Sequence, residues 1–161
     1  MSSTDPFAVK PLALVRPSDL YDLFQEVVGI FAFSSCSYIG RPNVPPTDCL
    51  EAEYTIKIQG PVVATVVLRS TMAAARGLAQ GVSLHEPRED AESLDALKEL
   101  ANLFAGHLMT SCLGGKHQVF EPFLPIRSRP SDWPAREADA ACALLLESEA
   151  VELRYWQEPR S

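Results

Sequence analysis

The stretch from Leu94 to Leu108 reads Leu-Asp-Ala-Leu-Lys-Glu-Leu-Ala-Asn-Leu-Phe-Ala-Gly-His-Leu, and it carries two opposite faces in one helical pattern. Its apolar positions recur at spacings of three and four residues, the period of a helix that packs against a core. These positions are Leu94, Leu97, Ala101, Phe104 and Leu108. Three polar residues, Asp95, Glu99 and Asn102, follow at i, i+4 and i+7 and therefore share the other face. The pattern predicts an amphipathic helix with a polar stripe.

The polar stripe places a carboxylate beside a carboxamide. Neither group is a nucleophile at neutral pH, but together they suit a site that holds a cation and orients a water molecule. Gly106 falls on the same face, where a glycine costs roughly 1 kcal/mol relative to alanine. A bare backbone at that position would let another surface approach closely. The alternative is an ordinary solvated helix face, because charged residues on amphipathic helices are normally exposed.

Pro125 completes the pattern Asp-x3-Glu-x2-Asn-x22-Pro. This pattern resembles the signature of the CheC/CheX/FliY family of chemotaxis phosphatases. The run Glu-Leu-Ala-Asn followed by Gly106 is similar to the family's E-L-x-N-x-x-x-G run, and Phe-Glu-Pro-Phe-Leu-Pro at 120–125 is similar to its proline-bearing strand. The order of predicted elements also agrees over most of residues 15–157.

The resemblance implies an α/β fold of the α+β type, in which a mostly antiparallel sheet carries two long helices in a CheC-like pseudo-repeat. It implies a phosphatase, a hydrolase that removes the phosphoryl group from an aspartate of a CheY-like response-regulator receiver in chemotaxis or two-component signalling. No cofactor is expected on this chain, because the receiver partner would hold the Mg²⁺. The similarity to the one-site CheX branch also implies a homodimer. The alternative is a non-enzymatic receiver-binding or dimerisation module of the same fold.

The same resemblance implies a role for each residue of the motif. Asn102 would orient a water in line with the phosphorus, and Glu99 would pair with the receiver's phosphate-site lysine. Asp95 would support that docking, although a solvated acidic neighbour explains it equally well. Gly106 and Pro125 would be supporting residues, and the proline would shape a strand end beside the helix.

A weak internal repeat relates this helix to an earlier one. Asp22 and Glu26 have the spacing of the first two motif residues, but the asparagine position is Gly29 and the proline position is Ala52. If the repeat is real, the first site is inactive, and one working site is the pattern of the CheX branch. A chance match of two common acidic residues is the alternative.

Length and composition predict one globular domain. The 161 residues are 47% hydrophobic, which is enough for a core, and we expect a lead-in over 1–17, a single CheX-like domain over 18–157 and a tail over 158–161. A net charge of −7 disfavours nucleic acid as a partner. No apolar run approaches the roughly 20 residues of a membrane helix, and the start lacks a secretory signal. These features predict a cytoplasmic protein without a membrane partner.

Cysteines and histidines show no spacing that indicates a metal site. The cysteines, which we expect to be reduced, are Cys36, Cys49, Cys112 and Cys142. The histidines, which we expect to be structural or exposed, are His85, His107 and His117.

Hydrophobic periodicity and turn residues predict the remaining elements. They are a helix over 19–33 with Ser18 as its N-cap, a long loop over 34–50, strands over 53–58 and 62–69, a short helix over 71–80 ended by Gly81, the motif helix over 90–113, a strand over 117–124, a loop over 125–135, and a final hairpin of strands 141–147 and 151–156. The last strand carries Tyr155 and Trp156, and we expect one strand of this hairpin to be a sheet edge that pairs two copies. The alternative is a monomer in which Tyr155 packs in the chain's own core and Trp156 lies on a helix.

Overall fold

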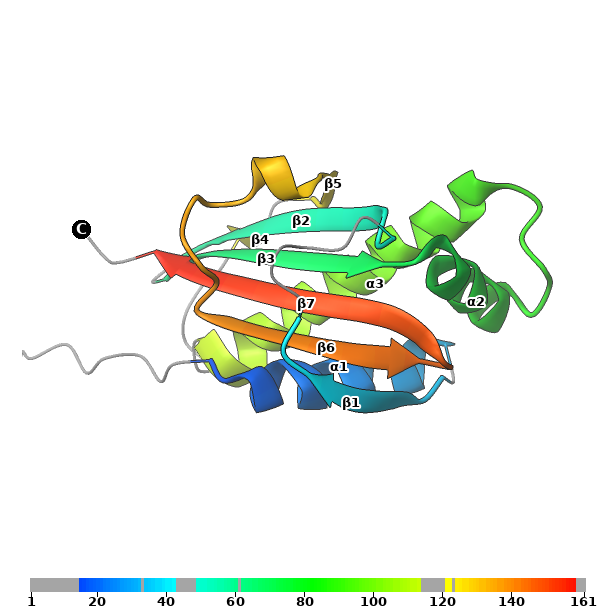
Figure 1. Cartoon of the computed structure of the whole chain (residues 1–161), viewed down its shortest axis with the longest axis horizontal. Coiled ribbons are helices and arrows are strands. Elements are labelled where there is room, and N and C mark those ends of the chain that lie inside the picture. The colour runs from blue at the N-terminus through cyan, green and yellow to red at the C-terminus, as the bar shows by residue number, and fades with distance from the viewer. Residues whose placement is uncertain are drawn as a thin grey trace, which may run out of the picture.

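The computed structural model describes residues 15–32, 34–42, 49–60, 62–113, 121–122 and 124–158. Its strands are β1 (Cys36–Gly40), β2 (Ala52–Gln59), β3 (Val63–Ser70), β4 (Glu121–Pro122), β5 (Ile126–Arg127), β6 (Ala140–Leu146) and β7 (Glu149–Glu158). All strand pairs in this part of the chain are antiparallel, and the order across the sheet is β1-β6-β7-β3-β2-β4. The short strand β5 also pairs with β2, so β4 and β5 together border that strand (Figure 1).

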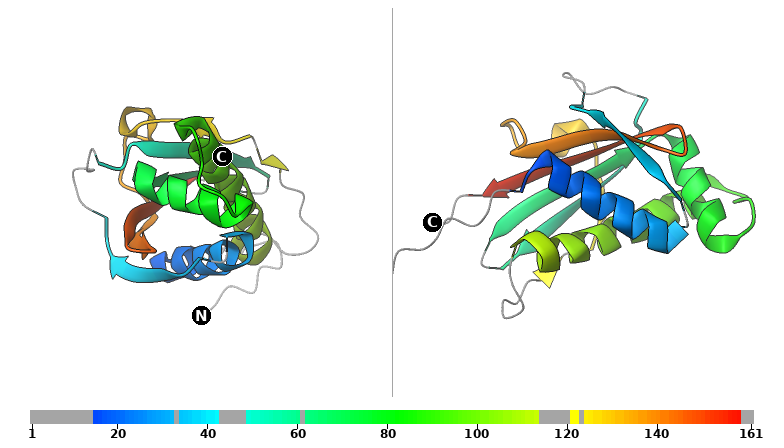
Figure 2. Two further views of the ribbon diagram at one scale, coloured as in Figure 1. Left: turned by 90° about the vertical axis from the view of Figure 1, so that its right-hand side faces the viewer. Right: turned by 90° about the horizontal axis from the view of Figure 1, so that it is seen from below.

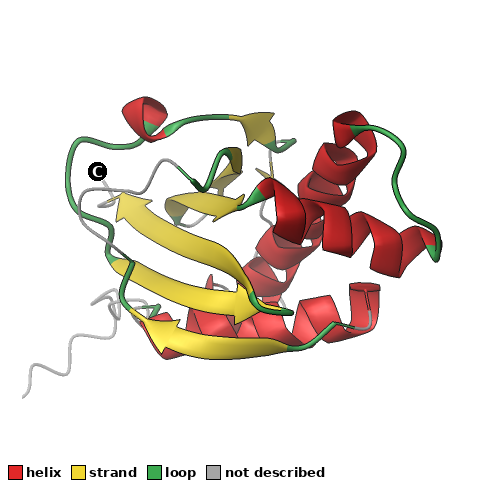
Figure 3. Cartoon of the chain, turned by 45° about the vertical axis from the view of Figure 1, so that its right-hand side comes forward, coloured by secondary structure: helices red, strands yellow, loops and turns green. Residues whose placement is uncertain are grey.

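Two long helices, α1 (Pro17–Ala32) and α3 (Asp90–Leu108), lie side by side on one face of the sheet (Figure 2). The shorter helix α2 (Met72–Ser83) packs against α3 at one end of the sheet (Figure 3). This arrangement confirms the predicted fold class, a mostly antiparallel sheet with two long helices on it.

The core lies between this helical layer and the sheet. Strand β3 pairs with β2 from Ala64 to Ser70, and residues that are paired across the two strands point to the same face of the sheet. The buried residues that these strands and β7 turn toward the helices are Ala52, Tyr54, Ile56, Ile58, Ala64, Val66, Leu68, Val151, Leu153 and Tyr155. Phe24 of α1 meets Phe104 of α3 edge to face, with ring centroids 6.1 Å apart. This contact joins the two helices beneath the sheet.

Several predicted boundaries are wrong. Helix α1 begins at Pro17, so Ser18 lies inside it rather than at its N-cap. Strand β1 lies within the predicted loop over 34–50; it has no alternating pattern because most of its residues are exposed at the sheet edge. Helix α2 continues beyond Gly81 to Ser83, and the left-handed residue that ends it is Leu84.

The motif helix covers residues 90–113 as predicted, because α3 ends at Leu108 and continues as one π-helical turn, Met109–Leu113. The elements after it differ from the prediction in detail. The predicted strand over 117–124 falls largely outside the described residues, where β4 is its only described pairing. The predicted loop over 125–135 contains β5 and a short 3-10 helix, Pro130–Asp132.

The final hairpin is not an edge of the sheet, which overturns the structural basis of the predicted dimer contact. Strand β7 lies between β6 and β3, and β6 lies between β1 and β7. Tyr155 and Trp156 are both buried within the chain. Long apolar strands of this kind gain most stability in the middle of a sheet, where both faces are covered.

The sheet face opposite the helices carries a row of buried charges, which we call the charge row: Glu53, Arg69, Glu152 and Arg154. The strand register places Glu53 opposite Arg69, and Arg69 opposite Glu152. Ion pairs follow this register, with 3.3 Å between Arg69 Nε and Glu53 Oε1 and 3.4 Å between Arg69 and Glu152 Oε2. Arg154 also lies 3.2 Å from Glu152 Oε2. Negative and positive side chains alternate across neighbouring strands, so each buried charge has an opposite charge beside it that offsets the cost of its removal from water.

A covering segment, residues 128–136, closes over the charge row. Ser128 Oγ donates to Glu53 Oε2 at 2.5 Å, and Trp133 Nε1 donates to the same oxygen at 3.1 Å. The Trp133 ring also lies against the guanidinium groups of Arg69 and Arg154, at 5.3 and 4.6 Å from its centroid. The carboxylate of Glu53 therefore links two residues of the covering segment to the sheet.

Replacement of Glu53 by alanine is expected to destabilise the fold by about 3 kcal/mol or more, because it leaves buried arginine charge and two polar donors without their acceptor. Urea denaturation followed by circular dichroism measures the change. The control is Glu51→Ala, which removes an exposed carboxylate two residues earlier and is expected to change stability by less than about 0.5 kcal/mol. Equal stability of the two variants would contradict the anchoring role of Glu53.

Candidate functional site

The motif helix α3 turns its polar stripe outward, as the spacing predicts. Asp95 and Glu99 are exposed, and Asn102 and Gly106 are half-buried. Its opposite side is buried against the sheet and the other two helices: Ser93, Leu97, Leu100, Ala101, Phe104, Ala105 and Leu108. The structure therefore brings together four of the five predicted site residues on one solvent-facing surface.

Gly106 leaves the end of the stripe open. A Cβ atom added to this glycine would meet nothing within 4 Å among the described neighbours. Thr110, in the π-helical turn that follows, donates its hydroxyl to the carbonyl oxygens of Gly106 and His107, each at 3.2 Å. Because Gly106 has no side chain, the helix surface here is consistent with the predicted close approach of another surface.

Pro125, the fifth motif residue, does not join the polar stripe. It is buried and stands directly before β5, which pairs with β2. Because α3 packs against β2, the proline sets the start of a strand at the sheet edge beside the motif helix. This position agrees with the expected shaping role rather than with a direct contact to a ligand.

Helix α1 presents the corresponding surface without a carboxamide. Asp22, Glu26 and Gly29 are all exposed, and a Cβ atom at Gly29 would meet nothing within 4 Å. The two helices thus display carboxylates at equivalent spacings on the same side of the sheet. Only α3 adds a side chain able to donate and accept hydrogen bonds at the third position.

Arg127 and Tyr54 lie on the part of the sheet against which α3 packs, and they were not identified from the sequence. The register pairs Arg127 of β5 with Tyr54 of β2, and the guanidinium carbon stands 5.7 Å from the centre of the tyrosine ring. The pKa of the Tyr54 hydroxyl is raised above its usual value, mainly by burial. The negative charge of Asp95 adds to this rise, and the positive charge of Arg127 opposes it. Arg127 thus contacts Tyr54 from β5, the strand that pairs with β2. Only the strand register reveals this proximity.

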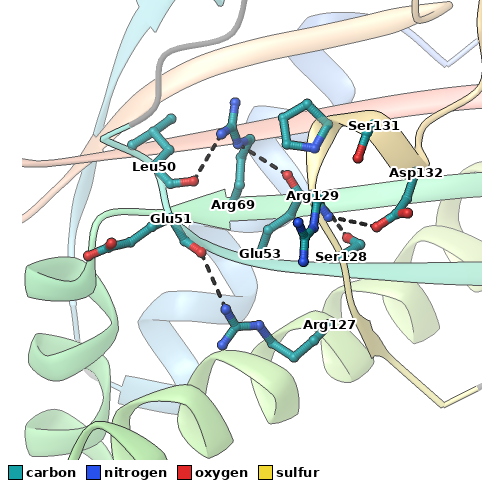
Figure 4. Close-up of a pocket in the computed structure, with 10 residues that line it drawn as sticks. Leu50, Glu51, Glu53, Arg69, Arg127, Ser128, Arg129, Ser131 and Asp132 are labelled. Carbon is teal, nitrogen blue, oxygen red and sulfur yellow. Dashed lines mark hydrogen bonds and ion pairs between the residues drawn. The ribbon is translucent and has the colours of Figure 1, made fainter.

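A hollow of about 750 Å³ lies between the first residues of β2 and the covering segment (Figure 4). It is lined by Leu50, Glu51, Glu53, Arg69, Arg127, Ser128, Arg129, Pro130, Ser131 and Asp132. Glu53 and Arg69 are engaged with each other there, and Arg69 donates to the Leu50 carbonyl at 2.9 Å. No residue of the α3 stripe lines this hollow, so the candidate site is an open surface.

The predictions about the cysteines, a membrane helix and the histidines can be compared with the described residues. Cys36, Cys49, Cys112 and Cys142 are free thiols, and burial raises the pKa of Cys142 to about 12. Within the described residues, no helix combines the length and apolar character needed to cross a membrane. His117 lies outside the part of the chain that the structure describes.

Several solved structures have a fold similar to that of this chain. The sequence itself matches no family model and no curated protein. The chain is similar to CheX in a CheX–CheY–BeF3–Mg²⁺ complex from Borrelia burgdorferi, with a TM-score of 0.68 and 16% identity over 91% of this chain and 99% of that one. It is also similar to a CheC-like protein from Shewanella oneidensis, with a TM-score of 0.65 and 15% identity over 90% and 97% of the two chains.

A CheX from Desulfovibrio desulfuricans has a TM-score of 0.64 and 12% identity over 86% of this chain and 96% of that one. At these identities the comparison establishes the fold, and it agrees with the CheX branch that the motif resembles. The chain therefore has the fold of the CheX and CheC-like chemotaxis proteins.

Proposed function

We propose that this protein is a phosphatase that hydrolyses the aspartyl phosphate of a CheY-like receiver domain in two-component signalling, with chemotaxis as the pathway implied by its structural neighbours. The supporting observation is the outward placement of Glu99 and Asn102 on α3 of a CheX-like fold. One neighbour of that fold is a CheX in complex with CheY. The receiver domain would be a cytoplasmic partner, which implies a cytoplasmic location for this protein.

The chemistry requires positioning more than covalent help. A water oxygen attacks the phosphorus, the bond from phosphorus to the aspartate oxygen breaks, and the products are inorganic phosphate and a free carboxylate. The Asn102 side chain has an acceptor oxygen that can orient the attacking water and no charge that would repel the phosphoryl oxygens. The amide is not a base, so the proton of the water passes to a phosphate oxygen or to solvent.

Glu99 is proposed to dock the helix. It lies one helical turn before Asn102, is exposed, and can form a charge-assisted hydrogen bond with a lysine beside the receiver's phosphorylation site. Asp95, one turn earlier, extends the same acidic surface. Mg²⁺ would be held by the receiver and would neutralise charge on the phosphoryl group, so this chain needs no metal ligand of its own.

A receiver-binding or dimerisation module without activity remains the alternative. A binder would use the charge of Glu99, but it would have no need for a carboxamide on the same face. Asn102 therefore favours the phosphatase.

We also propose a homodimer, formed through β1 instead of the final hairpin. Strand β1 borders the sheet and pairs only with β6 among the described strands. Its residues Tyr38 and Ile39 are 51% and 56% exposed, which is unusual for large apolar side chains at an unprotected edge. Antiparallel pairing of β1 with β1 of a second copy would satisfy the free backbone groups and cover these side chains.

Replacement of Asn102 by alanine is expected to reduce stimulated hydrolysis by about 100-fold or more, because the water loses its orienting group. The measurement is phosphate release from the cognate phosphorylated receiver, chosen from a panel of the host's receivers. Asn102→Asp should also lose activity, since it puts negative charge beside the phosphoryl group. The control is Glu26→Ala on α1, which should remain nearly as active as the wild type. A wild-type rate in Asn102→Ala would refute the assignment.

Replacement of Glu99 by lysine is expected to weaken binding of the phosphorylated receiver by about tenfold or more, because attraction to the partner's lysine becomes repulsion. Titration calorimetry with a beryllofluoride-activated receiver measures the affinity. Glu26→Lys makes the same charge change at the equivalent position of α1 and should bind like the wild type. Unchanged affinity of Glu99→Lys would count against the docking role.

Sedimentation at micromolar concentration tests the homodimer. A species near twice the 17.6 kDa chain mass is expected for the wild type, and a smaller species for Ile39→Lys, which places a charge on the β1 edge. The control is Ile126→Lys, which places the same charge at an exposed position of β5, near the other edge of the sheet. This variant should remain dimeric. A wild-type species near 17.6 kDa would exclude the dimer.

A further inference from the structure

Arg127 is a positive charge on β5, the short strand that pairs with β2 where α3 packs against the sheet. Its partner in the β5–β2 register is Tyr54, whose side chain points to the helix-bearing face of the sheet. Neighbouring residues in paired strands share a face, so the Arg127 side chain also points toward the side on which α3 lies. The guanidinium then stands 5.7 Å from the centre of the Tyr54 ring and remains exposed.

Local contacts restrict the position of this guanidinium but do not use all of its N–H donors. It donates to the carbonyl oxygen of Glu51 at 3.4 Å, a long hydrogen bond (Figure 4). The guanidinium carbon also lies within cation–π distance of the Tyr54 ring. An arginine carries five N–H donors in a planar fork, so the group keeps donor capacity toward solvent.

The segment that carries Arg127 is itself held firmly. Pro125 is buried just before it, and Ser128 just after it donates to the buried carboxylate of Glu53 and lies 2.7 Å from the hydroxyl of Thr55. The backbone that carries Arg127 is thus anchored on both sides. This anchoring lowers the entropy that the segment loses when a partner binds.

The sign of this charge is opposite to that of its surroundings. The chain has a net charge of −7, and Asp95 and Glu99 form an acidic surface on α3. The proposed partner brings a phosphoryl group and the acidic groups that hold Mg²⁺. The carboxylates of an acidic stripe alone would repel these negative groups. A cation on the sheet edge against which α3 packs offsets that repulsion and orients the partner.

We propose that Arg127 is a positioning residue of the docking surface, where its guanidinium pairs with an oxyanion of the bound receiver. This inference rests on the proposed function. The oxyanion is either a carboxylate on the receiver surface or an oxygen of the phosphoryl group, since a planar guanidinium fork binds both in the same geometry.

The test is steady-state phosphate release by Arg127→Gln at a series of concentrations of the cognate phosphorylated receiver. The half-saturating concentration is expected to rise about tenfold while kcat stays within about twofold, because docking is weakened and the water-orienting residue is untouched. The effect should shrink as salt rises and screens the pair. Arg127→Lys should recover part of the loss. The control is Arg41→Gln, the same charge change at an exposed residue beyond β1.

Binding to unphosphorylated and beryllofluoride-activated receiver separates the two sources of the oxyanion. A loss confined to the activated receiver identifies the phosphoryl group, and an equal loss for both forms identifies a carboxylate. Wild-type saturation behaviour in Arg127→Gln, with an active wild-type protein, overturns this inference alone. A wild-type protein that releases no phosphate from any of the host's phosphorylated receivers overturns the proposed function and this inference with it.

Discussion

The burial of one side of helix α3 is the constraint on which the rest of the structure depends. Phe104 must pack against Phe24 of α1 and beneath the sheet, because removal of large aromatic surface from water is the strongest local gain in stability. Once that side is buried, helical geometry sends the positions between the apolar residues outward. The surface presented by Asp95, Glu99 and Asn102 is therefore a consequence of the core and needs no separate support.

The opposite face of the sheet has a different organisation. There the charge row spans β2, β3 and β7, and Trp133 and Ser128 close over it through the carboxylate of Glu53. A buried ionic row contributes less to stability than an apolar layer of the same area, but its hydrogen-bond requirements fix one arrangement of the covering segment. That segment in turn sets the position of Pro125 and β5 at the border of α3. The polar side of the sheet thus helps to shape the candidate site on the helical side.

An open surface suits the proposed substrate. Small-molecule sites are usually concave and enclosed, whereas the α3 stripe is a helix surface with a half-buried glycine, free of close neighbours, at one end. A receiver domain would supply the enclosed phosphorylation site, and this chain would supply a carboxamide that enters it. The contrast between Asn102 on α3 and Gly29 on α1 would give a chemical reason for the single working surface that we propose in a fold with two similar helices.

The sequence alone determined the elements whose signal is local. The 3-4 spacing of Leu97, Ala101 and Phe104 predicted both the helix and its outward stripe, and the β-branched run at 62–69 predicted a central strand. What only the tertiary structure decided depends on pairing between distant segments. The neighbours of β7, the edge position of β1 and the placement of Arg127 against Tyr54 all follow from strand register, which is selected by the packing of the whole sheet. No short stretch of sequence encodes that choice, because each strand buries its apolar side equally well in more than one place until the other strands are present.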